Sequence, residues 1–167
     1  MPLTEFAQMF QVELRILAYV VLAMILGGAI GFEREAKDKP AGLRTHMLVS
    51  GATALLVSLG DVVVQHFDTG LPSQLVQSDP IRLIEAIVAG VSFLGAGTII
   101  RHRSGKQIEG LTTAASILFT AAVGVAVALS QVVLAVGATI VVLLTLHALP
   151  VIERFLQTTA GQETDGQ

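Results

Sequence analysis

The sequence predicts an all-α membrane protein, a bundle of five transmembrane helices. Of its 167 residues, 53% are hydrophobic and only 14% are charged, and the mean hydropathy is +0.73. Soluble domains carry about 25% charged residues, so this chain has too few charges to cover a water-facing surface. It also contains five apolar stretches near the roughly 20 residues that a helix needs to cross a bilayer. Helices are expected because backbone groups in lipid must pair with one another.

The first predicted span covers residues 15–33 and is uncharged from Ile16 to Phe32. A cleavable signal peptide is the alternative. Such a peptide begins with a basic segment and has a shorter apolar run, whereas the charged residues before this run are Glu5, Glu13 and Arg15. We therefore expect a retained span.

The second predicted span, 46–66, reaches full length only by including Asp61. The third, 81–100, follows Asp79 and Pro80. Aspartate is a preferred helix N-cap and proline suits the first helical turn. These two residues therefore predict where the third helix begins.

The last two predicted spans, 111–129 and 132–151, lie in one uncharged stretch that is too long for a single crossing. A tight turn is therefore expected at Ser130-Gln131. The transmembrane domain is predicted over 1–155, and the polar residues 156–167 are predicted to form a disordered tail.

The distribution of lysine and arginine predicts the orientation. Under the five-span topology, eight of these cations fall on one side and only Arg15 and Arg82 on the other. Cytoplasmic loops carry the excess of lysine and arginine. The N-terminus is therefore predicted outside and the C-terminus in the cytoplasm. The eight cations are Arg34, Lys37, Lys39, Arg44, Arg101, Arg103, Lys106 and Arg154.

Shifting the sequence by 68 positions aligns it with itself without a gap. Leu26-Gly27 then falls on Leu94-Gly95, and Gly42-Leu43-x-Thr45 falls on Gly110-Leu111-x-Thr113. One interpretation is a parallel repeat of predicted helices 1–2 and 3–4, with a fifth helix added. The other is coincidence between two membrane segments rich in small and aliphatic residues.

Small residues recur inside the spans at helical spacing. Backbones approach closely at such residues when helices associate in lipid. Packing is the favoured interpretation, and a hydroxyl-lined polar path is the alternative. The predicted packing glycines are Gly27, Gly31, Gly90, Gly95, Gly97 and Gly124, and the stripe on the fourth span is Thr112, Ser116, Thr120, Gly124 and Ala128.

Charged residues mark both ends of the spans. Glu33 lies at the cytoplasmic boundary, where Arg34 or Arg44 could pair with it, and ordinary interfacial anchoring is the alternative. At the opposite end, Arg82 lies three residues from both Asp79 and Glu85 along a helix and can bridge them. Charged side chains at this depth are costly and often functional. The alternative is that Arg82 and its carboxylate partners neutralise one another and only stabilise the helix end.

A hard cation such as Mg²⁺ takes carboxylate oxygens as ligands. Asp61, Asp79 and Glu85 are predicted at a similar depth near the outer boundary and could supply carboxylate ligands. One chain would supply too few of these ligands for tight binding. Catalytic patterns are missing, since the sequence has no cysteine and its four histidines lack zinc-site spacing. We therefore predict no enzyme and no bound cofactor. The net charge of −3 predicts no nucleic-acid partner.

Five segments together resemble the signature of the MgtC/SapB membrane family. In chain order they are Gly31-Phe32-Glu33-Arg34-Glu35, Lys39-Pro40-Ala41-Gly42-Leu43-Arg44-Thr45-His46-Met47-Leu48-Val49, Asp79-Pro80-x-Arg82, Phe93-Leu94-Gly95-Ala96-Gly97 and Gly110-Leu111-Thr112-Thr113-Ala114-Ala115-Ser116. The resemblance implies a bacterial inner-membrane protein of about five spans. It also implies a link to growth under magnesium limitation and to virulence through survival inside macrophages.

The resemblance implies membrane partners as well, including ATP synthase and a phosphate sensor kinase. The residues it indicates as functional are Glu33, Arg34, Arg44, Thr45, Asp79 and Arg82. Two departures stand out. This chain resembles the short family members that lack a C-terminal ACT-like domain, and Ser92 occupies a position where the family pattern commonly has glycine.

The predicted function is regulation of membrane partners in adaptation to low magnesium or in intracellular survival. The alternative is a transporter of magnesium or another cation that uses Asp61, Asp79 and Glu85. A homodimer would give such a transporter more ligands.

Overall fold

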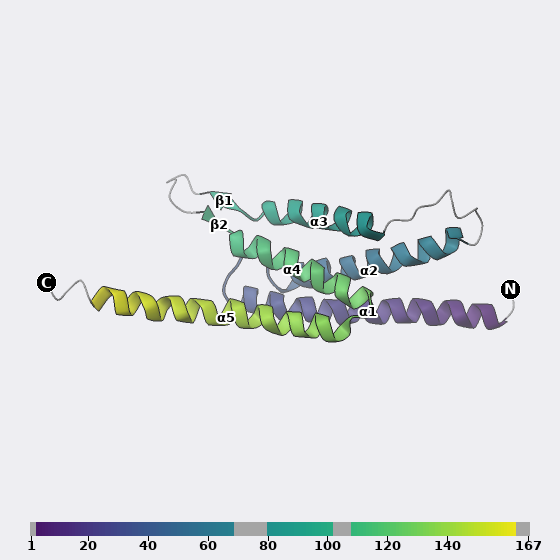
Figure 1. The fold of residues 1–167 in the computed structure, drawn as a ribbon, viewed down its shortest axis with the longest axis horizontal. Coiled ribbons are helices and arrows are strands. Elements are labelled where there is room, and N and C mark those ends of the chain that lie inside the picture. Colours follow the sequence, from purple (N-terminus) through teal and green to yellow (C-terminus); the bar gives the residue numbers. More distant parts are fainter. Residues whose placement is uncertain (1–2, 69–79, 102–107, 163–167) are drawn as a thin grey trace.

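The structure, a computed structural model, describes residues 3–68, 80–101 and 108–162. Five helices and one small hairpin make up the fold (Figure 1). In chain order the elements are α1 (Leu3–Glu35), α2 (Leu43–Asp68), α3 (Pro80–Ala96), β1 (Ile100–Arg101), β2 (Ile108–Glu109), α4 (Leu111–Ala128) and α5 (Val132–Gln162). The predicted all-α bundle of five helices is confirmed.

Helices α1, α2 and α4 form the centre of the bundle, and each packs against the other two. Helix α5 packs on α1 and α4, whereas α3 packs on α4 and α2 (Figure 1). The start of α1 and the end of α5 lie at opposite ends of the long axis (Figure 1), as five crossings would place them. We call the end where α1 stops and α2 begins the Glu33 end, and the other end the Asp61 end.

Within the described part of the chain, three helices are long and apolar enough to cross a membrane: α1 from Ala7 to Glu35, α2 from Leu43 to Val64, and α4. The described apolar part of α5, Val132–Ala148, is shorter. Helix α3 has 17 residues, about 25 Å at 1.5 Å per residue. It is thus shorter than the predicted span 81–100.

The early end of α3 has a local cause. Glycine has low helix propensity, and Gly95 and Gly97 both fall in the last turn or just after it. The Thr98 hydroxyl donates a 2.7 Å hydrogen bond to the Gly95 carbonyl. The chain then pairs β1 with β2 in an antiparallel hairpin, so the predicted helical residues 97–100 form a turn and a strand.

Two other helix boundaries differ from the prediction. Helix α1 begins at Leu3 instead of residue 15, and α5 continues to Gln162. Residues 156–162 of the predicted disordered tail are therefore helical, and residues 156–160 contain neither glycine nor proline to end the helix. Residues 163–167 lie outside the described part. The predicted turn at Ser130-Gln131 is confirmed, with Ser130 at φ 61°.

The predicted packing glycines separate into two groups. A Cβ added to Gly27 would lie 2.6 Å from the His46 carbonyl oxygen, and one added to Gly31 would lie 2.8 Å from Leu43 Cα. Gly124 lies as closely against the backbone of Ser50. By contrast, a Cβ on Gly90 would meet nothing within 4 Å.

The other two predicted packing glycines, Gly95 and Gly97, lie in or just after the last turn of α3. Gly95 makes an ordinary contact with Ala114, and Gly97 lies only against its own preceding turn. Within the described residues, neither Gly90 nor Gly97 closely approaches another helix, so their packing role stays a prediction. In the predicted stripe on α4, Ser116 and Thr120 are buried, but Thr112 is exposed and Thr113 is buried in its place.

Candidate functional site

The candidate site lies where α1 ends and α2 begins. The connection between them is short and hydrogen-bonded: the Lys39 N–H donates to the Arg34 carbonyl at 3.0 Å, and Asp38 adopts φ 52°. The Glu35 carboxylate accepts a 2.8 Å hydrogen bond from the Leu43 N–H at the start of α2. A carboxylate is favourable there because the first helical N–H groups lack intrahelical partners. The connection thus fixes the end of α1 against α2.

An ion cluster of Glu33, Arg34 and Lys37 occupies this end. Arg34 Nε donates to Glu33 Oε2 at 2.6 Å, and Lys37 Nζ lies 2.5 Å from Glu33 Oε1. The Arg34 side chain is only 3% exposed. Removing a guanidinium from water is costly unless a counter-charge accompanies it. Glu33 supplies that charge, and the cluster carries a formal net charge of +1.

Lys37 also joins α1 to α5. Its Nζ donates a 2.7 Å hydrogen bond to the Leu146 carbonyl. In a regular helix that carbonyl would accept from the N–H of residue 150, but residue 150 is proline, which has none. Lys37 therefore replaces the donor that Pro150 removes. This links the ion cluster to the middle of α5.

His46 lies next to the cluster on α2 and is 0% exposed. Its Nδ1 is 2.9 Å from the Gly42 carbonyl oxygen, and its Nε2 is 3.0 Å from Ser116 Oγ on α4. The Ser116 hydroxyl is also placed to donate a 2.8 Å hydrogen bond to the Thr113 carbonyl oxygen. The imidazole thus connects α2 to α4 inside the bundle.

The hydrogens in this chain can be counted. A carbonyl oxygen only accepts, so Nδ1 of His46 must carry a hydrogen. Ser116 has one hydroxyl hydrogen to give. If Ser116 donates to Thr113, Nε2 must also carry a hydrogen and His46 is an imidazolium. If Ser116 instead donates to Nε2, His46 is neutral and Thr113 loses that bond. In either arrangement the imidazole of His46 hydrogen-bonds α2 to Ser116 on α4.

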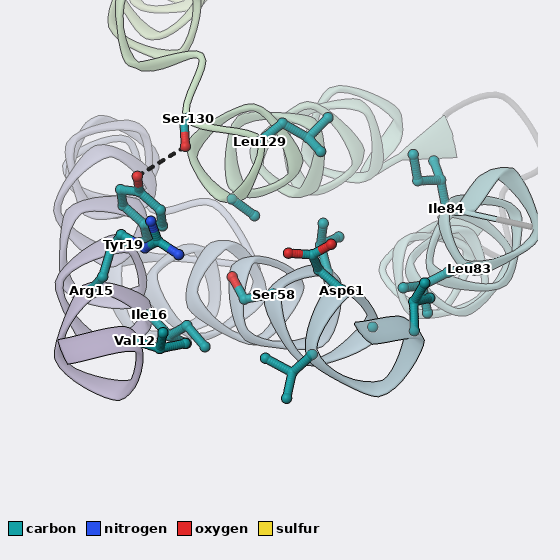
Figure 2. Close-up of a pocket in the computed structure, with 15 residues that line it drawn as sticks. Val12, Arg15, Ile16, Tyr19, Ser58, Asp61, Leu83, Ile84, Leu129 and Ser130 are labelled. Carbon is teal, nitrogen blue, oxygen red and sulfur yellow. Dashed lines mark hydrogen bonds between the residues drawn. The ribbon is translucent and has the colours of Figure 1, made fainter. Parts of the chain in front are cut away.

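A cavity of about 640 Å³ opens at the Asp61 end, between α1, α2, the start of α3 and the α4–α5 turn (Figure 2). Its walls are mostly apolar. Tyr19 Oη and Ser130 Oγ, 2.9 Å apart, join α1 to the α4–α5 turn on one side. The other polar lining residues are Arg15, Ser58 and Asp61.

The structure brings together only some of the predicted site residues. Glu33 pairs with Arg34 as expected, whereas the Arg44 side chain is exposed and the second partner is Lys37. Thr45 is half-buried next to His46. Their functional roles remain predictions.

At the other end, Arg82 and Glu85 lie exposed on α3. Asp79 is outside the described residues, and with it the predicted bridge to Arg82 and the set of Asp61, Asp79 and Glu85. Among the side chains that the structure describes, no three from His, Asp or Glu come together to hold a metal ion.

Sequence reasoning missed His46, Ser116 and Lys37 as interacting residues. His46 stands inside the motif that begins at Lys39, but its spacing matched no metal or catalytic pattern. Pro150 was the available signal for Lys37, because a proline inside an apolar helix leaves a carbonyl that needs an external donor.

Comparison with known proteins agrees with this architecture. The MgtC family model matches residues 20–155. The chain is 38% identical over 136 residues to "Protein MgtC" of Salmonella typhimurium, covering 81% of this chain and 51% of that protein. It is 33% identical over 150 residues to "Protein SapB" of Bacillus subtilis, covering 90% and 63%.

A third relative is named "Putative magnesium transporter YhiD", from Escherichia coli. It is 39% identical over 129 residues, which cover 77% of this chain and 57% of the relative. The chain thus spans between half and two thirds of the length of these relatives. No solved structure matches it. Because the family model covers most of the apolar bundle described above, this multi-pass membrane protein belongs to the MgtC family.

Proposed function

We propose that this chain is a non-enzymatic regulator located in the bacterial inner membrane. It binds another membrane protein and regulates it during adaptation to low magnesium. One observation carries the proposal: the middle of the bundle is filled. Ala23, Ala54 and Thr120 are all fully or nearly fully buried there. Helix α4 meets α2 at Gly124, and α1 meets α2 at Gly27, both at backbone contact distance. A tightly packed centre suits a binding protein better than a conduit.

The surface of α3 supports binding in the bilayer. Phe93 is 84% exposed, and Gly90 faces open space on the same helix. Helices in lipid associate through close contact at small residues. A partner helix could therefore approach α3 closely at Gly90. ATP synthase and a sensor kinase are the partners that the family resemblance suggests.

The proposed orientation has the N-terminus outside and the C-terminus in the cytoplasm. In the structure, the α1–α2 connection, the strands β1 and β2 before α4 and the end of α5 lie toward one end (Figure 1). Along the sequence, eight of the ten lysines and arginines lie in these segments or in the adjoining parts of the helices, and such residues favour the cytoplasmic side.

Cross-linking in native membranes followed by purification of the full chain tests the regulator proposal. Two glycines offer matched variants, since a Cβ at either Gly90 on α3 or Gly137 on α5 meets nothing within 4 Å. Gly90→Leu should lower recovery of a defined partner about tenfold, and Gly137→Leu should not. Recovery of the chain alone, or equal effects of the two variants, would remove the basis of the proposal.

A cation transporter is the second candidate. It is supported by the name of the YhiD relative and by the carboxylate of Asp61 in the cavity. Magnesium flux into proteoliposomes separates the candidates. Uptake that is lost in Asp61→Asn would favour transport. Flux no greater than in empty vesicles would eliminate it.

A further inference from the structure

The cavity at the Asp61 end combines features that the packed centre lacks. Its volume of about 640 Å³ falls within the range of small-molecule sites, roughly 300–1,000 Å³. Apolar side chains from four helices, including Val12, Val57 and Ile84, form much of its wall. Such a wall suits a hydrocarbon chain.

Two opposite charges line the same cavity from different helices. Arg15 comes from α1 and Asp61 from α2, and Figure 2 shows both side chains directed toward the space between them. Asp61 has an interaction of its own within the chain, but a carboxylate has several acceptor positions and can serve more than one donor. The cavity therefore offers both a cation and an anion.

Ser58 gives an independent indication of a ligand. Its side chain is 7% exposed, and its hydroxyl has no hydrogen-bond partner. Figure 2 shows this hydroxyl pointing into the cavity between Arg15 and Asp61. Buried polar groups are almost always hydrogen-bonded, so each exception needs an explanation. A polar ligand group in the cavity would supply the missing partner.

We propose that this cavity binds a phospholipid whose headgroup combines a phosphate with a primary ammonium, as in phosphatidylethanolamine. Arg15 contacts the phosphate and Asp61 the ammonium. Ser58 donates to a phosphate or ester oxygen, and an acyl chain lies along the apolar wall. A guanidinium suits phosphate because it presents several donors in one plane. This inference is independent of the regulator proposal.

Native mass spectrometry of the purified full chain tests the site, with equal amounts of phosphatidylethanolamine and phosphatidylglycerol added. The wild type should retain the ethanolamine lipid preferentially. Arg15→Gln should lower the retained fraction about tenfold, as expected for one lost charge-assisted contact. Ser58→Ala should lower it less, and Asp61→Asn should remove the headgroup preference. Lys39→Gln, an exposed cation at the other end, is the matched control and should change nothing.

A cavity-filling variant provides a second test. Ala128 lines the cavity, so Ala128→Phe should abolish lipid retention. If that variant does not fold, Arg15→Gln still decides, because its side chain is exposed. Equal retention of both lipids by the wild type, or wild-type retention by Arg15→Gln, would overturn the proposal. So would displacement of the lipid by soluble phosphoethanolamine, which has the headgroup without the chains.

Discussion

The α1–α2 pair and the α3–α4 pair are each joined by a glycine that packs on the facing helix, but the residues that the two glycines contact differ in polarity. The 68-residue shift that aligns the sequence with itself places Gly27 on Gly95 and His46 on Ala114. In the structure, Gly27 packs on His46 and Gly95 packs on Ala114. The same pair of positions therefore meets in both halves, which favours the parallel repeat over coincidence.

The two halves differ in how tightly they are joined. An added Cβ would lie 2.6 Å from the neighbouring backbone at Gly27 but 3.4 Å from it at Gly95. The first pair also contains the ion cluster and the buried imidazole, whereas the helices of the second pair are connected through a hairpin of two short strands, β1 and β2. The two halves thus share one close contact between helices. The ion cluster and the buried His46 are found in the first half, and the position equivalent to His46 in the second half is Ala114.

The largest difference between the halves should appear when both glycines are replaced by alanine. Gly27→Ala forces a methyl group into the α2 backbone and should lower the free energy of unfolding by about 2–3 kcal/mol, the cost of overpacking. Gly95→Ala meets Ala114 at ordinary contact distance and should change it by no more than about 0.5 kcal/mol. Equilibrium unfolding in mixed micelles measures both. Equal losses would contradict the unequal packing of the halves.

Replacement of the imidazole should have the next largest effect. His46→Ala leaves a cavity and removes the partners of Gly42 and Ser116, so we expect a loss of about 2 kcal/mol. In a double-mutant cycle with Ser116→Ala, the two changes should couple by about 1 kcal/mol, since the residues share a hydrogen bond. His147→Ala is the control because that histidine is exposed. Additive losses would show that the His46–Ser116 contact contributes nothing.

The lysine link from the first half to α5 should have a smaller effect. Lys37→Met removes the donor to the Leu146 carbonyl and should cost about 1 kcal/mol. In a Pro150→Ala background, residue 150 supplies its own N–H to that carbonyl. The same lysine replacement should then cost markedly less. If its cost is unchanged by Pro150→Ala, Lys37 acts through Glu33 alone.

Much of the fold could be predicted because it depends on local properties. The lack of charge predicted helices that cross a membrane, and the turn at Ser130-Gln131 followed from the length of one apolar stretch. Helix ends were less predictable. The end of α3 depends on glycine propensity and on one hydroxyl of Thr98, and hydropathy reports neither.

The candidate site was less predictable because it depends on distant pairs. The pairing of Glu33 with Arg34 follows from adjacency along the chain. By contrast, the contact between His46 and Ser116 joins residues 70 positions apart, and the Lys37–Leu146 bond joins residues 109 positions apart. Apolar periodicity does not specify which helix faces which, so these contacts required the structure.

The smallest expected effect concerns Gly90, which is exposed although its equivalent in the first half is packed against the core. Gly90 faces open space, whereas the residue aligned with it in the first half, Leu22, packs against the core. Gly90→Ala removes the entropic penalty of a helical glycine without adding a contact. We therefore expect a gain of about 0.5–1 kcal/mol in the free energy of unfolding of the isolated chain in micelles. A loss of stability would mean that Gly90 already meets another chain in the micelle, and cross-linking of the same sample would then yield a dimer.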